Sequence, residues 1–252
     1  MHKIDIPESV IDSVIARRGT AHPFADFDPK TTALVVIDMQ NGFMVPGVAH
    51  ALCEMAPTIV PAINQLAQAL RKAGGKVFWI QNTHDESCFT SWSVLYDYMK
   101  PESGRKRIEA MTEGSPGHAL WPELDVQPED QRVLKFRYSA FIQGSSDLPG
   151  LLRSQGYDTV LIAGTVTNTC CESSARDAMM LNFKTIMVSD ANAAHSDADH
   201  NAALIAFYRL FGDVMSSREI IDICRRESHS GASVYAGPDA KQTGTREHFP
   251  KP

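Results

Sequence analysis

The feature that most constrains the fold is a pair of short, almost uninterrupted apolar runs, at residues 32–38 and 158–163. Neither run alternates between apolar and polar residues, so each fits a strand that is buried on both faces, as in a parallel sheet. The stretch 58–72 has apolar residues spaced along one helix face and ends at Gly74 and Gly75. This alternation predicts a doubly wound α/β fold with a mostly parallel sheet and right-handed crossovers.

The same pattern continues through most of the chain. Further strands are expected at residues 76–81, 131–135, 184–189 and 213–215, and further helices at residues 147–154, 170–181, 197–211 and 216–225. The stretch 87–117 shows no clear period, and we expect a long irregular insertion of the kind that forms lids or binding loops. Its aromatic residues have a plainer alternative role, which is to pack the insertion onto the body of the domain.

The 252 residues fit one large domain. We place it at residues 31–227, between an N-terminal arm at 1–30 and a tail at 228–252 that is rich in Gly, Ser, Pro and charge. The net charge of −6 and the lack of a basic run argue against a nucleic-acid partner. No apolar segment approaches the roughly 18 residues that span a membrane, and residues 1–20 do not resemble a signal peptide.

The five cysteines show neither a C-x-x-C motif nor a Cys/His zinc spacing. Free thiols in a reducing compartment are the simplest interpretation of this pattern. We therefore expect a cytoplasmic protein.

Three chemically active residues stand where predicted strands end: Asp38, Lys135 and, after the turn at Gly164, Cys170. Each has an ordinary alternative role, as a helix cap, a solvated lysine or a small buried apolar residue. The carboxyl ends of parallel strands share one edge of the sheet, and ligands bind there. We therefore expect the three side chains to meet.

A cysteine at the start of a helix lies beside unpaired N–H groups and the positive end of the helix dipole, which favours the thiolate. Asp38 is suited to accept the thiol proton, and Lys135 to hold Asp38 and stabilise the thiolate. This chemistry needs no histidine. We expect His195 and His200, after the fifth strand, to cap a helix or lie on the surface.

The chain has no G-x-G-x-x-G after its first strand, no G-x-x-x-x-G-K-[ST] and no G-x-S-x-G. Residues 36–43 (VIDMQNGF), Lys135 and residues 164–178 (GTVTNTCCESSARDA) instead resemble the isochorismatase-like cysteine hydrolases over residues 31–225. The resemblance implies a six-stranded parallel sheet with helices on both faces and a triad of Asp38, Lys135 and Cys170. It also implies a cis peptide between Thr165 and Val166, and an oxyanion hole formed by the N–H groups of Val166 and Cys170.

Nicotinamidases of this superfamily bind a metal through Asp-x-His after the second strand. The corresponding residues 82–86 (NTHDE) lack that arrangement, so we expect no metal and no cofactor. Residues 81–86, 137–141 and 147–154 are similar to the ureidoacrylate amidohydrolases, and enzymes that cleave biuret or triuret share the same machinery. The resemblance therefore implies a cysteine-dependent amidohydrolase that acts on a small ureido or carbamoyl compound and releases ammonia or an amine.

The sequence is also compatible with three other functions. One is an isochorismatase-type enzyme that cleaves a vinyl ether with Asp38 and without the thiol. A second is another small-amide hydrolase of the superfamily, and a third is a binding protein of the same fold that has lost catalysis.

The substrate pocket is expected to combine two kinds of residue. Asn82 and Glu86 are suited to hydrogen-bond the ureido N–H groups, whereas Phe43, Trp92 and Tyr138 are suited to wall the pocket and exclude water. Cys171 is expected to face inward and to be replaceable. The family and the long arms suggest a homodimer or homotetramer.

Overall fold

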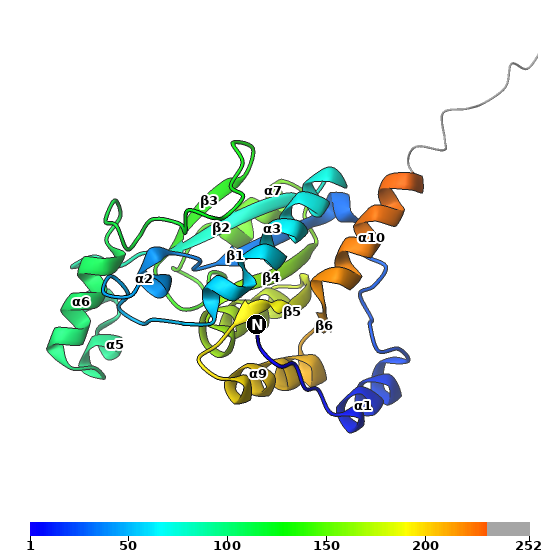
Figure 1. The fold of residues 1–252 in the computed structure, drawn as a ribbon, viewed down its shortest axis with the longest axis horizontal. Coiled ribbons are helices and arrows are strands. Elements are labelled where there is room, and N and C mark those ends of the chain that lie inside the picture. The colour runs from blue at the N-terminus through cyan, green and yellow to red at the C-terminus, as the bar shows by residue number, and fades with distance from the viewer. Residues whose placement is uncertain (231–252) are drawn as a thin grey trace, which may run out of the picture.

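The computed structural model describes residues 1–230, so most of the expected tail lies outside the described residues. Its centre is a six-stranded sheet in which every paired strand is parallel, in the order β3-β2-β1-β4-β5-β6 (Figure 1). The strands are β1 (Thr32–Ile37), β2 (Lys76–Asn82), β3 (Gln131–Lys135), β4 (Thr159–Thr165), β5 (Lys184–Ala193) and β6 (Asp213–Met215). This sheet confirms the predicted fold class.

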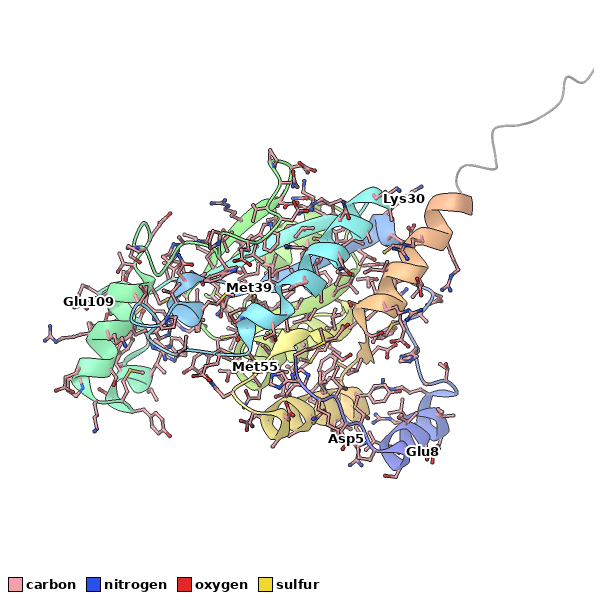
Figure 2. All side chains as sticks on the ribbon, viewed as in Figure 1. Asp5, Glu8, Lys30, Met39, Met55 and Glu109 are labelled. Carbon is pink, nitrogen blue, oxygen red and sulfur yellow. The ribbon has the colours of Figure 1, made fainter. Side chains whose placement is uncertain are left out.

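Helices cover both faces of the sheet. The helices α3 (Ala56–Lys72) and α10 (Ser217–Ser230) pack on one face, and α7 (Leu148–Ser154), α8 (Glu172–Met180) and α9 (Asp197–Leu210) pack on the other. The N-terminal helix α1 (Glu8–Arg18) lies against α9. Figure 2 shows the side chains that fill both layers, with Met39 inside the molecule and Glu109 at its outer edge.

The two-sided core explains the uninterrupted apolar run of β1. Leu34 and Val36 face the layer of α3 and α10, whereas Ala33, Val35 and Ile37 face the layer of α7 to α9. Every residue of the strand is buried. Because side chains alternate across a strand, a strand between two helical layers needs apolar residues at every position.

The prediction of an irregular insertion at 87–117 was wrong. The segment contains α4 (Cys88–Ser91), α5 (Ser93–Asp97) and α6 (Pro101–Met111), which extend from one end of the molecule (Figure 1). The buried residues of α6 include Gly104 and Ala110, so its apolar face is too small to give a clear helical period. Two short elements lie earlier in the chain, the 3₁₀ turn η1 (Pro29–Thr31) before β1 and α2 (Asn41–Met44) after it.

The fifth strand continues through polar residues to Ala193, beyond its predicted end at residue 189. The register of β4 against β5 shifts between Ile162 and Gly164. The buried Asn192 amide donates to the carbonyls of Ile162 and Val188 at 2.8 and 2.7 Å. A side chain therefore supplies bonds to the sheet where the backbone register is broken. Among residues 1–230, no helix is long and apolar enough to cross a membrane.

Candidate active site

Three side chains converge at the carboxyl edge of the sheet. Lys135 Nζ lies 2.9 Å from Asp38 Oδ2 and donates to Cys170 Sγ at 3.5 Å. A third bond runs from Lys135 Nζ to the Arg137 carbonyl at 3.0 Å. Asp38 and Lys135 are fully buried, and Cys170 is 3% exposed. The structure therefore brings together the three residues that the sequence singled out, while their catalytic roles remain predictions.

Strand order explains how residues so far apart in the chain meet. Asp38 directly follows β1, and Lys135 ends β3, with β2 between the two strands. The lysine side chain is long enough to reach past the end of β2. Asp38 adopts a left-handed backbone conformation with φ of 56°, which a non-glycine residue rarely does. Such a conformation costs about 1–3 kcal/mol, which the surrounding structure must offset, and it is found most often at functional sites.

The carboxylate of Asp38 is held with few partners. Its oxygens contact Lys135, the Cys170 thiol and the backbone of Asn82, and they have no further hydrogen-bond partner among the described residues. Burial raises the pKa of Asp38 above its ordinary value, although the Lys135 ammonium opposes that shift. Burial alone would lower the pKa of Lys135, but the charge of Asp38 outweighs it and raises the pKa. Asp38 is therefore a base whose proton affinity is increased.

The nucleophile candidate lies in a wide helical turn, η2 (Thr167–Cys171), between β4 and α8. The Thr165–Val166 peptide is cis, as the resemblance implied, and Val166 is buried. Burial raises the pKa of the Cys170 thiol to about 12, in the direction opposite to the one expected from the helix start. The resting thiol is protonated, so the base beside it must take the proton during attack.

Cys171 is the neighbouring thiol and differs in its surroundings. It is fully buried and packs in the layer of α7 to α9, which confirms that it faces inward. Burial raises its pKa well above the ordinary value. Its replaceability remains a prediction.

The expected pocket residues fall into two groups. Asn82 is buried at the end of β2 with its Oδ1 unpartnered, and Phe43 is buried in α2. The Trp92 ring lies 4.9 Å from the Tyr138 ring. Glu86, in contrast, is exposed, and its side chain forms no hydrogen bond or ion pair with residues 1–230. The structure therefore gives no support for the predicted role of Glu86.

Two histidines beside these residues were missed as binding candidates. His84 is fully buried and stacks on Trp92 at 6.0 Å, with Nδ1 2.7 Å from the Tyr96 hydroxyl and Nε2 unpartnered. Both ring nitrogens of His50, whose ring lies 4.8 Å from that of Phe43, are buried without a partner. Burial, followed by the charge of Arg107, lowers the pKa of His50 to about 3 and that of His84 to about 2.

Both rings are therefore neutral, and each has a free nitrogen. The position of His84 after β2 was a signal in the sequence, but it was considered only for metal binding. His50 lies in a loop that carried no signal. Within residues 1–230, no group of three or more His, Cys, Asp and Glu residues is arranged to hold a metal ion. The expected absence of a metal stays a prediction.

The sequence and the fold are similar to those of known proteins. Residues 32–219 match the family described as Isochorismatase domain. The ureidoacrylate amidohydrolase RutB of Caulobacter vibrioides is 31% identical over 207 residues, covering 76% of this chain and 90% of that protein. A cysteine hydrolase from Pseudomonas syringae pv. phaseolicola 1448A has a TM-score of 0.71 at 30% identity, covering 80% of this chain and 95% of that one. An N-carbamoylsarcosine amidase from Thermoplasma acidophilum has a TM-score of 0.59 at 25% identity, covering 74% and 96%.

Proposed function

Because this chain belongs to the isochorismatase family of hydrolases, we propose that it is a cysteine-dependent amidohydrolase acting on a small ureido or carbamoyl compound. The family and its relatives support hydrolysis of amide C–N bonds. The finer proposal is carried by one observation, the contact of the buried Lys135 ammonium with both Asp38 and Cys170. A thiol, a carboxylate and a cation in mutual contact form the minimal set for nucleophilic attack on a carbonyl.

In the first step, Cys170 Sγ forms a bond to the carbonyl carbon while its proton moves to Asp38. The raised pKa of Asp38 favours this transfer, since the thiol itself is a weak acid in the buried site. The C–N bond then breaks, and Asp38 returns the proton to the departing nitrogen. Ammonia or an amine leaves, and the acyl group remains on Cys170 as a thioester-type intermediate.

In the second step, a water molecule gives its proton to Asp38 and attacks the acyl carbon. The bond from that carbon to Cys170 Sγ breaks, and the thiol regains a proton. When ammonia has left from a ureido group, the released product is a carbamate, which decomposes to an amine and carbon dioxide. Lys135 stays protonated throughout and offsets the negative charge that passes between Asp38 and the sulfur.

The negative charge on the carbonyl oxygen needs donors of its own. The N–H groups of Val166 and Cys170 are the proposed oxyanion hole, because both belong to the buried segment that carries the nucleophile. Removing one such donor typically lowers the rate by about 100–1000-fold.

The residues around the triad suit a flat, polar substrate. Asn82, His84 and His50 provide unpartnered polar atoms, which are costly to bury unless a ligand pairs with them. Phe43, Trp92 and Tyr138 provide apolar walls. The charges of Arg107, Lys135 and Arg137 all act on His84, which favours a substrate with a carboxylate next to its ureido group. A ureidoacrylate-type compound fits this description better than the uncharged biuret or triuret.

Ammonia release from a panel of compounds tests the proposal. The panel comprises ureidoacrylate, biuret, triuret, N-carbamoyl amino acids and nicotinamide. We expect turnover of the ureido carboxylates and little or none of nicotinamide. A protein that releases ammonia from none of the ureido or carbamoyl compounds contradicts the proposed substrate class.

Alkylation with iodoacetamide separates the thiol mechanism from vinyl-ether cleavage by Asp38 alone. Inactivation is expected to be slow at neutral pH and faster as the pH rises, because the pKa of the Cys170 thiol is about 12. Substrate is expected to protect the enzyme. Full activity after complete alkylation of Cys170 would exclude the thioester route.

We also propose a reducing, cytoplasmic location, which is supported by the five cysteines, none of which forms a disulfide within residues 1–230. A homodimer or homotetramer remains a proposal as well. It is supported by exposed apolar side chains such as Ile142 and Met180, which line the same surface pocket. Light scattering after gel filtration gives the mass of the assembly.

A further inference from the structure

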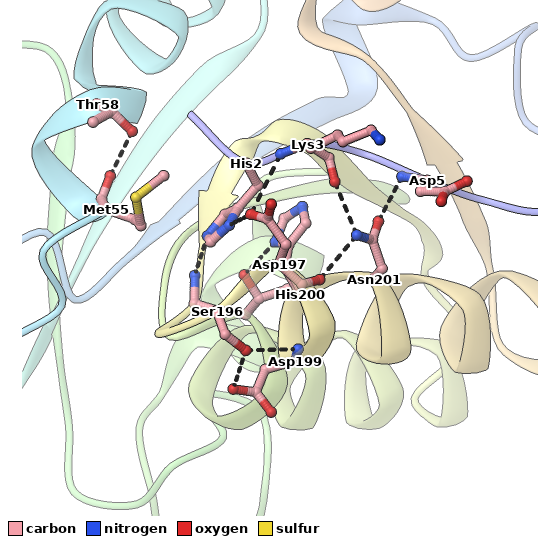
Figure 3. A network of polar contacts seen from close by, with 12 residues as sticks. His2, Lys3, Asp5, Met55, Thr58, Ser196, Asp197, Asp199, His200 and Asn201 are labelled. Atoms are coloured by element: carbon pink, nitrogen blue, oxygen red, sulfur yellow. Dashed lines mark hydrogen bonds and ion pairs between the residues drawn. The ribbon is translucent and has the colours of Figure 1, made fainter.

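A buried chain of polar side chains runs from the N-terminal arm to the turn that carries Cys170. Thr167, the first residue of that turn, has its Oγ1 2.9 Å from His200 Nδ1. The ring of His200 stacks on the ring of His2, with centroids 4.4 Å apart and planes at 16° (Figure 3). Thr167 and His200 are fully buried, and the His2 side chain is 2% exposed. The proposed mechanism uses none of these three residues.

The partners of His200 define its protonation. Its Nε2 lies 3.0 Å from the Ser189 carbonyl, which only accepts, so Nε2 must carry the hydrogen. Burial, followed by the nearby His2, lowers the pKa of His200 to about 4, so the ring is neutral near pH 7. The Nδ1 atom is then an acceptor, and the Thr167 hydroxyl donates to it. The His200 ring therefore links the backbone of β5 to the η2 turn.

His2 is fixed in the opposite tautomer. The Ala194 N–H donates to His2 Nε2 at 2.9 Å, so His2 Nδ1 carries the hydrogen and donates to Asp197 Oδ1 at 2.7 Å. Two further bonds anchor this part of the arm to Asn201 of α9, from the Asp5 N–H at 2.8 Å and to the Lys3 carbonyl at 2.9 Å (Figure 3). The arm thus covers one face of the His200 ring with a side chain that has no freedom to rotate.

Thr167 is held at its backbone as well. Its carbonyl accepts the N–H of Glu172, a bond that closes the wide η2 turn around Cys170. The preceding residue, Val166, accepts the N–H groups of Thr169 and Cys171 at 3.0 and 3.3 Å. Fixing Thr167 therefore fixes the peptide units on both sides of it. Those units lie between the N–H groups of Val166 and Cys170 that form the proposed oxyanion hole, within the turn that these bonds close.

We propose that His200 is a positioning residue for this turn and acts through the Thr167 hydroxyl. His2 of the arm supports it by packing against the ring and excluding water. The inference rests on the proposed function, because it assigns His200 to the geometry of the same site. Neither histidine touches the reacting atoms, so neither is a catalytic residue.

The pair Thr167→Val and Thr167→Ser tests the inference. Valine removes the hydroxyl but keeps the shape, whereas serine keeps the hydroxyl. Because small displacements of a reacting geometry cost up to about 100-fold in rate, we expect T167V to lower kcat by roughly 10–100-fold. KM should change far less, and T167S should stay close to wild type. Rates are expressed per Cys170 thiol that iodoacetamide titrates, so that misfolded protein does not count.

A double-mutant cycle with His200→Phe identifies the path of the effect. Phenylalanine fills the place of the ring but has no polar atom. If His200 acts through Thr167, the T167V/H200F variant loses no more kcat than the worse single variant. Losses that add up, or a T167V variant with the kcat of wild type per titrated thiol, would overturn the inference.

The arm has its own matched controls. His2→Ala uncovers the ring and leaves the Ala194 N–H without its partner, so we expect a smaller loss of kcat than in T167V. Lys3→Ala should have no effect, because only the backbone of Lys3 takes part. Equal effects of both substitutions would overturn the role given to His2.

Two readouts need no substrate and separate this inference from the proposed function. Nitrogen-15 NMR of labelled histidine should show His200 neutral at pH 7 with its hydrogen on Nε2. The alkylation rate of Cys170 should change in T167V but not in T167S. If wild type releases no ammonia from any ureido compound, the proposed function fails. A His200 that is charged or protonated on Nδ1, or an unchanged alkylation rate in T167V, contradicts the positioning role.

Discussion

A buried carboxylate lies at each end of strand β3, and the two differ in how many hydrogen-bond donors they have. Asp130, just before β3, accepts from Arg71 Nη2 at 2.6 Å, Trp79 Nε1 at 2.8 Å and the Gln127 N–H at 2.8 Å. Asp38, beside the Lys135 that ends β3, has contacts only with that lysine, the Cys170 thiol and the backbone of Asn82 among the described residues.

The pKa values follow this difference in hydrogen bonding. Burial raises the pKa of both carboxyls, but the bond from Arg71 and the other donors bring that of Asp130 below its ordinary value. For Asp38 burial prevails, so its pKa is raised. A carboxylate whose oxygens are all paired stabilises the fold, whereas one left short of donors has capacity to accept a proton. A structural ion pair and the proposed catalytic ion pair therefore lie one strand length apart and differ in how many donors their carboxylates have.

The largest effect is expected at the nucleophile. Cys170→Ala should lower kcat by on the order of 10⁴-fold or more, because no other thiol reaches the substrate carbonyl. Cys171→Ala is the matched control and should keep activity near that of wild type, since this buried thiol serves only packing. Ammonia release by both purified variants measures the difference. Equal losses in the two variants would contradict the assignment of the nucleophile.

Isosteric amides at the two carboxylates test the comparison directly. Asp38→Asn removes the base and should lower kcat by about 10²–10⁴-fold, a typical range for general acid–base catalysis. Asp130→Asn should leave kcat nearly unchanged. It should lower the free energy of unfolding by about 3 kcal/mol, because the Arg71 guanidinium loses one of its two carboxylate partners. Steady-state kinetics and urea denaturation measure the two effects. A loss of kcat in D130N without a loss of stability would remove the distinction.

As the pH is lowered, Asp38 should be protonated before Asp130. Asp38 works as a base only when ionised, and its pKa is raised, so kcat/KM should fall at a pH above the ordinary aspartate value of 3.8. The pKa of Asp130 is lowered on folding. Its contribution to stability is therefore present above 3.8 and is lost as the pH falls through the lower folded value.

Activity is thus expected to disappear while the fold is still intact. Profiles of kcat/KM and of the unfolding midpoint against pH measure the separation between the two losses. Coincident losses would indicate that unfolding, and not protonation of Asp38, removes the activity.

The fold and the triad were largely predictable from the sequence, for a shared physical reason. A parallel sheet buried on both faces requires apolar runs such as residues 32–38, and chemistry at such a sheet lies where the runs end. Asp38, Lys135 and Cys170 could therefore be found from their positions alone, without any contact being known. Residues 131–135 and 213–215 were also predicted with the bounds that the structure has.

The remaining features depend on packing that the sequence does not display. The helices α4 and α5 are too short to show a period, and α6 has too few apolar residues to show one. The turn that exposes Glu86 has no local signal in the sequence. The raised pKa of the Cys170 thiol comes first from burial, which the position of a residue in the sequence does not show. His200 was expected to cap a helix or lie on the surface, but it is fully buried between Thr167 and Ser189. Its partners lie on other elements, so spacing along the chain could not identify them.

The placement of α4, α5 and α6 has a consequence for how such an enzyme diversifies. These helices form one continuous insertion between β2 and β3, and it contributes Trp92 while the three triad residues lie outside it. Exchange of this one insertion for another would change the wall of the proposed pocket that Trp92 forms, while Asp38, Lys135 and Cys170 stay in place. Part of the proposed pocket is therefore encoded on a stretch of the polypeptide that is free to vary without the proposed triad.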